Sequence, residues 1–261
     1  MNDNREDLLH QIKKYLEAEE EVFGPLAISG KELDSLDMDD EPQLDSEAVP
    51  SPEGKPVDEP AEKRVEKTGD LIADCKSLDE LKQLCKTAAE LKTDLKGTNL
   101  VFGTGNPRAD LMLIGEAPGE QEDKEGEPFV GAAGQLLNKI LAAINFSRND
   151  IYIANILKHR PPGNRNPNEE ECRNSLPYLY RQIELVNPKL ILCLGKISAT
   201  TLLGKNATLK SMRGTFYPFK GTELAVTYHP AALLRKQQWK RPVWEDVQRV
   251  RKRYDELGCQ P

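Results

Sequence analysis

The carboxyl-terminal part of the chain alternates short apolar runs with segments of helical periodicity. The apolar runs lie at residues 100–103, 111–115, 151–157, 190–195 and 224–229. Apolar side chains recur at helical spacing in the segments 134–145, 169–186, 196–203 and 243–257. Continuous apolar strands separated by helices are typical of a parallel sheet that is covered by helices on both faces. The pattern therefore predicts an α/β domain.

The first 92 residues have a different pattern. Leu8, Ile12 and Leu16 recur at roughly helical spacing, which predicts a short amphipathic helix within residues 1–26. Residues 27–74 are acidic, rich in proline and glycine and poor in aromatic residues, a composition that cannot bury enough apolar surface to offset chain entropy. We expect an acidic disordered linker there. A further helix is predicted at 77–92, with Ser77 as N-cap and Glu80 completing a capping box, so the folded domain spans 75–261.

Charge is divided unevenly between these two parts. Residues 1–74 hold 22 acidic and 8 basic side chains, so residues 75–261 hold 43 − 22 = 21 acidic and 36 − 8 = 28 basic ones. A basic domain with a net charge of +7 therefore follows an acidic arm with a net charge of −14. DNA binding and an ordinary globular surface with a solubilising tail explain this division equally well.

Composition also limits the cellular setting. The five cysteines are scattered without a CxxC pair, which indicates a reducing compartment and no disulfide framework. No run of eighteen apolar residues occurs, and the first ten residues lack the features of a signal peptide. The sequence therefore predicts a cytoplasmic protein with no membrane association.

Three groups of candidate functional residues follow strands, and the carboxyl ends of parallel strands meet at one edge of a sheet. The first is the segment 115–137, which opens with the turn sequence Gly-Glu-Ala-Pro-Gly, carries Phe129, and leads through Gly-Ala-Ala-Gly into a helix. The free backbone N–H groups of such a helix start can hold an anion. The alternative interpretation is a solvated acidic loop that joins a strand to a helix.

The second group is the segment 151–167. Asn155 lies at a strand end, where its amide can both donate and accept, as the edge of a pyrimidine base requires. Arg160 and Arg165 lie in a proline-stiffened loop that suits phosphate contacts. The alternatives are an asparagine that caps its own backbone and an ordinary loop.

The third group is the segment 228–236. His229 ends the last apolar run, and Leu233, Leu234 and Arg235 follow it. An apolar pair flanked by cations is what a wedge that enters a base stack requires. The alternative is a structural His-Pro pair after a strand.

Together these segments resemble the family 4 uracil-DNA glycosylases over about residues 98–255. The resemblance rests on three motifs in order: GEAPG-x-x-ED-x-x-G-x-PFVG-x-AG-x-LL, N-x-x-K-x-RPP-x-NR-x-P, and the T-x-HP-x-x-LLR segment at 227–235. It implies a three-layer α/β/α fold with a central, mostly parallel four-stranded sheet. It also implies a monomeric, bacterial-type, nucleoid-associated enzyme of base excision repair. Such an enzyme hydrolyses the N-glycosidic bond of flipped-out deoxyuridine in DNA, which releases uracil and leaves an abasic site.

The resemblance also assigns roles to single residues. Catalysis is implied for three: Glu116 and Ala117 position the attacking water, and His229 binds the uracil O2. The remaining roles divide into uracil binding, for which the residues are Glu122, Asp123, Phe129 and Asn155, and DNA binding, for which they are Arg160, Arg165, Leu233, Leu234 and Arg235.

The chain departs from this family at the iron–sulfur cluster. Family 4 members usually bind a [4Fe–4S] cluster through four cysteines, and the corresponding positions here are Ala88, Leu91, His159 and Ser175. Alanine and leucine offer no ligand atom, so we expect no cofactor and no metal. A residual metal site formed by Cys85, His159 and Cys172 is a separate hypothesis.

Other functions are weighed against this one. The alternative is a catalytically silent nucleic-acid-binding relative of the same fold. A phosphate-handling enzyme is disfavoured because both GxxxxGK[ST] and a GxGxxG after a strand are missing. The uracil-crosslinking branch is disfavoured because no basic insertion follows His159. Whether the acidic arm binds a partner protein is left open by the sequence.

Overall fold

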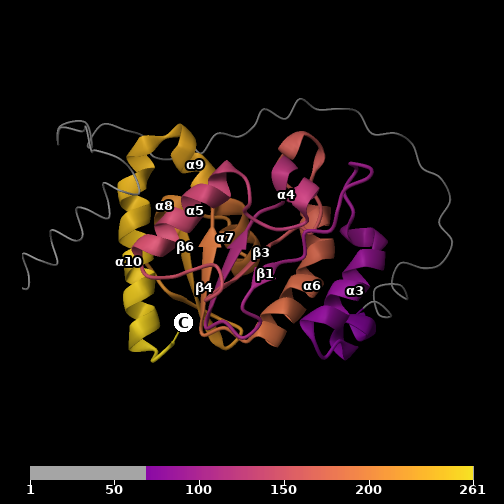
Figure 1. The fold of residues 1–261 in the computed structure, drawn as a ribbon, viewed down its shortest axis with the longest axis horizontal. Coiled ribbons are helices and arrows are strands. Elements are labelled where there is room, and N and C mark those ends of the chain that lie inside the picture. The colour runs from indigo at the N-terminus through magenta and orange to yellow at the C-terminus, as the bar shows by residue number, and fades with distance from the viewer. Residues whose placement is uncertain (1–68, 261) are drawn as a thin grey trace, which may run out of the picture.

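The computed structural model describes residues 69–260 (Figure 1). The predicted amphipathic helix at 1–26 and the predicted linker up to residue 68 lie outside the described residues. Residues 69–74 were predicted to belong to the linker, but they are helical and Ile72 is buried against the domain. The prediction is therefore wrong for these six residues. The cause is that only two apolar side chains, Leu71 and Ile72, follow a long acidic stretch, and composition alone does not separate them from it.

A six-stranded sheet forms the middle of the domain. Its order is β1-β3-β2-β4-β6-β5, and the four central strands are parallel. The predicted four-stranded parallel sheet is therefore confirmed, and one antiparallel strand is added at each edge. The strands are β1 (Thr104–Gly105), β2 (Leu111–Gly115), β3 (Tyr152–Asn155), β4 (Leu190–Leu194), β5 (Tyr217–Phe219) and β6 (Thr222–Thr227).

The apolar run at 100–103 is not a strand. Val101 and Phe102 are buried, and the backbone N–H of Val101 donates to the carbonyl of Lys158 at 2.9 Å. The segment is a buried connection, and the short strand β1 begins one residue after it. An apolar run shows burial, but ladder hydrogen bonds decide whether the run is a strand.

Helices fill the connections between the strands. Their bounds are α3 (Leu78–Thr87), η1 (Ala89–Leu91), α4 (Glu120–Glu125), α5 (Ala132–Ala143), η2 (Pro162–Asn164), α6 (Glu169–Val186), α7 (Lys196–Leu203), α8 (Leu209–Met212), α9 (Pro230–Arg235), η3 (Gln237–Trp239) and α10 (Lys240–Glu256). Helix α4 corrects the interpretation of its segment as an acidic loop: it buries no side chain, so it has no apolar periodicity to reveal it. No helix within residues 69–260 is both long and apolar enough to cross a lipid bilayer.

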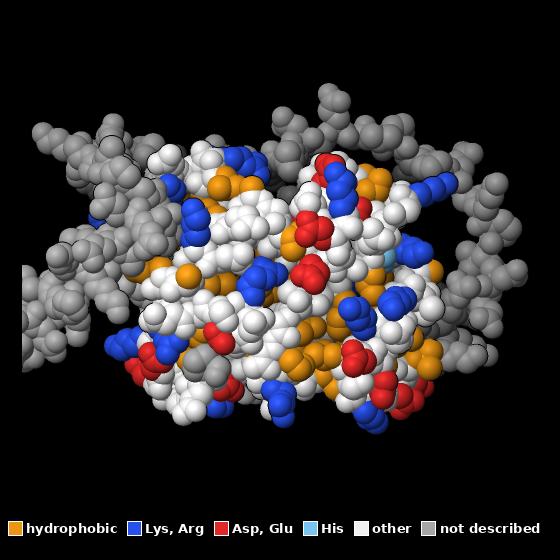
Figure 2. Space-filling view, in the orientation of Figure 1, with side chains coloured by type: hydrophobic (Ala, Val, Ile, Leu, Met, Phe, Trp, Pro, Cys, Tyr) orange, Lys and Arg blue, Asp and Glu red, His pale blue; other side chains and the backbone are white. Residues whose placement is uncertain are grey.

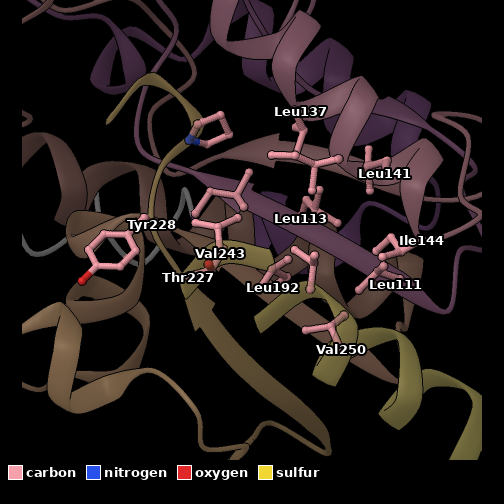
Figure 3. Close-up of a pocket in the computed structure, with 14 residues that line it drawn as sticks. Leu111, Leu113, Leu137, Leu141, Ile144, Leu192, Thr227, Tyr228, Val243 and Val250 are labelled. Carbon is pink, nitrogen blue, oxygen red and sulfur yellow. The ribbon is translucent and has the colours of Figure 1, made fainter. Parts of the chain in front are cut away.

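The domain has three layers, with α10 and α5 on one side of the sheet and α6 on the other (Figure 1). Helix α3 lies outside α6. The interface between α5, α10 and the sheet is filled by apolar side chains, among them Leu113, Leu137 and Val250 (Figure 3). The gap left there has a volume of only about 10 Å³, room for about one water molecule, so this face is a packed core.

Candidate active site

A cleft of about 710 Å³ opens at the carboxyl ends of the parallel strands. Four of the connections that follow these strands contribute to it: the segments after β2, β3, β4 and β6. Ligands of open α/β sheets bind at this edge because the loops there converge above the strand ends. The cleft brings together eight residues singled out in the sequence: Glu116, Ala117, Glu122, Phe129, Asn155, Arg165, His229 and Arg235.

Gly115 allows Phe129 and Asn155 to meet at the cleft floor. A β-carbon placed on Gly115 would lie 2.4 Å from Oδ1 of Asn155 and 2.7 Å from Cζ of Phe129. Both side chains are buried, and Oδ1 of Asn155 has no hydrogen-bond partner within the described protein. A buried amide oxygen without a partner is costly, and a ligand that donates a hydrogen bond would satisfy it.

The loop around Phe129 is held by charged side chains on both flanks. Phe129 has a φ of +55°, a left-handed conformation that is strained for a bulky residue. The Arg148 guanidinium donates to the carbonyls of Pro128 at 2.7 Å and of Phe129 at 3.0 Å. The Glu122 carboxylate accepts from the two backbone N–H groups that follow Phe129, at 3.0 and 2.9 Å. The strained conformation is therefore fixed by hydrogen bonds to its neighbours.

Glu122 also corrects the idea that the start of helix α5 could hold an external anion. The carboxylate of Glu122 itself accepts from the N–H of Gly131, the N-cap residue of this helix. The anion at the start of helix α5 is therefore a carboxylate of the protein itself. The same hydrogen bonds also tie α4, which contains Glu122, to the Phe129 loop.

His229 lies beside Phe129, with 5.4 Å between the ring centroids. Its Nδ1 accepts a hydrogen bond from the backbone N–H of Ala231 at 3.2 Å, so His229 is the N-cap of α9. Burial is the main cause that lowers the pKa of His229 to about 4; Glu122 opposes this shift and Arg235 adds to it. The imidazole is therefore neutral near pH 7, and its proton is on Nε2 because Nδ1 accepts.

Other predicted residues are placed differently. Asp123 does not line the cleft, because its carboxylate accepts from the backbone N–H of Asn99 at 2.7 Å. Arg160 is also outside the cleft lining, and its Nε donates to Asn164 at 2.7 Å. Arg165 lines the cleft while its guanidinium makes two hydrogen bonds with Glu171, at 2.7 and 2.8 Å.

The apolar pair before Arg235 is divided between core and surface. Leu233 is 1% exposed and packs in the core, so it is unavailable as a wedge. Leu234 is 53% exposed. The pair belongs to helix α9, in which consecutive side chains point in different directions, and sequence spacing alone did not separate them.

Basic residues outside the predicted DNA-binding set also line the cleft. They are Lys196 at the start of α7, Lys210 in α8, and Lys236 after α9. Lys and Arg side chains also gather over the end of the molecule that carries α9 (Figure 2). Of these three lysines, Lys196 could have been predicted from the sequence. It directly follows the apolar run 190–195, so the strand-end rule that marked Asn155 also applies to it.

The four positions that correspond to cluster ligands do not fit an iron–sulfur cluster. Ala88, Leu91, His159 and Ser175 are all buried, and Ala88 and Leu91 belong to an apolar group with Cys85 and Tyr178. His159 is held by Thr98, with 3.0 Å between its Nδ1 and the hydroxyl oxygen. In the described part of the chain, no group of three or more His, Cys, Asp or Glu side chains is placed to hold a metal ion. The hypothesis of a residual site at Cys85, His159 and Cys172 is therefore wrong.

The fold and the cleft define a class of protein, an α/β domain whose strand-end cleft is lined by an aromatic ring, an amide and a neutral imidazole. The family model described as "Uracil DNA glycosylase superfamily" matches residues 102–248. Type-4 uracil-DNA glycosylases are similar: the protein of Archaeoglobus fulgidus is 38% identical over 67% of this chain and 92% of its own length. The protein of Sulfurisphaera tokodaii is 40% identical over 67% of this chain and 84% of its own length. The protein of Thermotoga maritima is 39% identical over 60% of this chain and 84% of its own length. The chain belongs to the uracil-DNA glycosylase superfamily.

Proposed function

We propose that this uracil-DNA glycosylase excises flipped-out uracil with the side chains of Phe129, Asn155 and His229, and that it does so without an iron–sulfur cluster. The observation that carries the proposal is the meeting of Phe129 and Asn155 at Gly115, with His229 beside Phe129 and with the buried Oδ1 of Asn155 lacking a partner within the described protein. Uracil offers a donor at N3 that matches this oxygen, and an acceptor at O4 that matches the amide nitrogen. Phe129 then stacks on the base.

The reaction is hydrolysis of the bond between C1′ of the sugar and N1 of uracil. As the bond breaks, its electron pair moves to uracil and positive charge develops on the sugar. A neutral His229 that donates from Nε2 stabilises the negative charge at O2 more strongly than it binds the ground state. Water adds to C1′, its hydroxyl remains on the sugar, and its proton ends on uracil.

Glu116 and Ala117 line the cleft directly after β2. A carboxylate and a backbone carbonyl beside the sugar both favour the developing positive charge, and both can accept from the attacking water. Glu122 lines the pocket and fixes the Phe129 loop through its hydrogen bonds with the backbone N–H groups of Val130 and Gly131.

Cations and Leu234 supply the contact with DNA. Arg165, Lys196, Lys210 and Arg235 line the cleft and suit phosphate oxygens. Leu234 is the exposed apolar side chain that can occupy the space left by the flipped base. Extrusion of a base costs a few kcal/mol, which these contacts must offset.

The direct test is uracil release from an oligonucleotide that contains one deoxyuridine. We expect release by the full-length protein and a loss of about a hundredfold in rate for Asn155→Ala and for His229→Ala. Asn106→Ala, in a loop outside the cleft lining, is the control and should keep the rate. A full-length protein that binds the oligonucleotide but releases no uracil would instead favour the silent relative. Equal rates in all variants would refute the site assignment.

The cluster-free state has its own test, the visible absorption spectrum of anaerobically purified protein. The proposal is supported by Ala88 and Leu91, which have no atom that can bind iron. We expect no iron–sulfur absorption together with uracil release. Active protein with four bound iron atoms would refute the cluster-free proposal and leave the activity intact.

A further inference from the structure

Lys158 is a fully buried cation directly behind the uracil-binding amide. Its side chain is 0% exposed. The ammonium donates to the backbone carbonyl of Asn155 at 2.9 Å and to Oε1 of Gln182 on α6 at 2.5 Å. Its nitrogen also lies 6.0 Å from the centre of the Phe102 ring. Lys158 therefore holds Asn155, a cleft-lining residue whose buried Oδ1 has no partner within the described protein.

No carboxylate in the described part of the chain balances this charge. Among the described residues, no ion pair joins Lys158 to an acid, and both of its hydrogen-bond acceptors are neutral carbonyl oxygens. The titratable groups nearby are Cys85 on α3 and Tyr152 on β3, and burial raises the pKa of both, that of Cys85 to about 12. Burial lowers the pKa of Lys158 to about 8, so it is largely protonated at pH 7. An isolated buried charge is costly, and such groups concentrate at functional sites.

We infer that Lys158 is an electrostatic positioning residue for the reaction, a positive charge held behind Asn155 to stabilise the uracil anion as it leaves. This inference rests on the proposed function. Within residues 69–260 the cation has no counter-charge in the resting protein, and the leaving uracil supplies one when the bond between C1′ and N1 breaks. The interaction is therefore stronger in the transition state than in the ground state, which is the condition for catalysis.

The negative charge of the leaving uracil is spread over N1, O2 and O4. His229 donates at the O2 end, and the Asn155 amide contacts the O4 end with Lys158 behind it. The two ends of the anion are thus stabilised from different elements, α9 and the segment after β3. Lys158 touches the base only through Asn155, so its effect is long-range and depends on the charge that the leaving group acquires.

The experiment compares single-turnover excision of uracil and of 5-fluorouracil by full-length wild type and Lys158→Met. Methionine keeps most of the side-chain volume and removes the charge. We expect the uracil rate to fall about 10- to 100-fold with oligonucleotide affinity changed less than about threefold. The loss should be several-fold smaller for 5-fluorouracil, because its anion is intrinsically more stable and needs the cation less. A purely structural role would lower both rates equally.

Two further variants control the result. Lys189→Met removes a lysine that pairs with Asp110 at 3.4 Å next to the amino end of β4, and it should leave both rates unchanged. Where Lys158→Met does not fold, Lys158→Met/Gln182→Leu replaces the cation together with its side-chain acceptor. Equal losses for the two bases, or a wild-type uracil rate in a folded charge-free variant, would overturn the inference. Absence of uracil release by wild type would defeat the proposed function instead.

Discussion

The Nδ1 atom of His229 accepts a hydrogen bond from the backbone N–H of Ala231, 3.2 Å away. This contact makes one side chain serve two purposes. It caps helix α9, and it fixes the tautomer in which Nε2 carries the proton. Protonation of Nδ1 would place two donors against each other, so the neutral state is built into the start of the helix.

We therefore expect the rate to be insensitive to the protonation of His229 between pH 5.5 and 7.5. The pKa of His229 is lowered to about 4 in the folded protein, below its ordinary value near 6.5. Stability linked to this group is complete above the unfolded value and is lost as pH falls toward 4. Single-turnover rates and circular dichroism measured from pH 3.5 to 7.5 test this prediction. A rate that titrates near pH 6.5 and is flat in His229→Gln would contradict it.

Gly115→Ala should abolish most activity at a modest cost in stability. The added methyl group would collide with Oδ1 of Asn155 and the Phe129 ring, the two groups that we propose contact the base. We expect the single-turnover rate to fall at least about a hundredfold, because displacements of about 1 Å in a reacting geometry have effects of this size. Gly69→Ala, where a β-carbon meets nothing within 4 Å, is the matched control. Unchanged kinetics in Gly115→Ala would show that Phe129 and Asn155 do not act together.

Arg148→Met should weaken binding of the flipped base. The guanidinium holds the carbonyls of Pro128 and Phe129, and without it the left-handed Phe129 is free to relax. We expect KM to rise more than kcat falls, with a loss of about 2 kcal/mol in the free energy of unfolding for a half-buried charged donor.

Arg253→Met is the control for that prediction. Arg253 makes two hydrogen bonds to Glu223 at 2.6 and 2.7 Å, near the amino end of β6 and so at the opposite edge of the sheet from the cleft. This variant should lose stability without a change in KM. If both variants change KM alike, the Phe129 loop does not depend on Arg148.

Sequence patterns predicted the elements whose ends carry strong local signals. Helix α6 begins and ends at the predicted residues 169 and 186. Its start is well defined because Asn168 and Glu171 form a reciprocal capping box there. Strand β2 likewise matches the run 111–115. Helix α4 could not be found in this way, since no apolar stripe marks a helix that buries nothing.

The candidate site was predictable to a similar, limited extent. The strand-end rule placed Asn155 and His229 together, but the tautomer of His229 depends on a backbone N–H whose direction the sequence does not specify. The role of Arg148 was hidden for the same reason, because it binds carbonyls nearly twenty residues away along the chain. The sequence identifies which side chains carry chemistry, and tertiary hydrogen bonds determine their orientation.

Leu91, at one of the positions that correspond to cluster ligands, should contribute to stability through apolar packing. Leu91 is 1% exposed and packs in the apolar group with Cys85 and Tyr178. We expect Leu91→Ala to lower the free energy of unfolding by about 2–5 kcal/mol, because a buried cavity remains. Leu71→Ala, at a leucine that is 54% exposed, should change it by less than about 0.5 kcal/mol. Urea unfolding of both variants, with and without a chelator, gives the comparison. A chelator that destabilises the wild-type protein would contradict the proposal that the protein is stable without an iron–sulfur cluster.

Substitutions at Leu234 and at Leu233 should distinguish an effect on the contact with DNA from an effect on folding stability. Leu234 is exposed on α9 and Leu233 is buried beneath it. We expect Leu234→Ala to slow uracil excision from double-stranded DNA about tenfold and from single-stranded DNA much less. The reason is that only a duplex has a stacked gap for the side chain to fill once the base has left. Stability of this variant should be unchanged.

Leu233→Ala is the neighbouring control and should behave in the opposite way. It removes core volume, so the free energy of unfolding falls by about 2–5 kcal/mol, while the ratio of the double-strand to single-strand rates stays at the wild-type value. Measuring that ratio at a temperature where both variants are folded removes the effect of stability. If Leu234→Ala leaves the ratio unchanged, the exposed leucine of α9 does not enter the duplex, and the cost of base extrusion must be offset by the cleft cations alone.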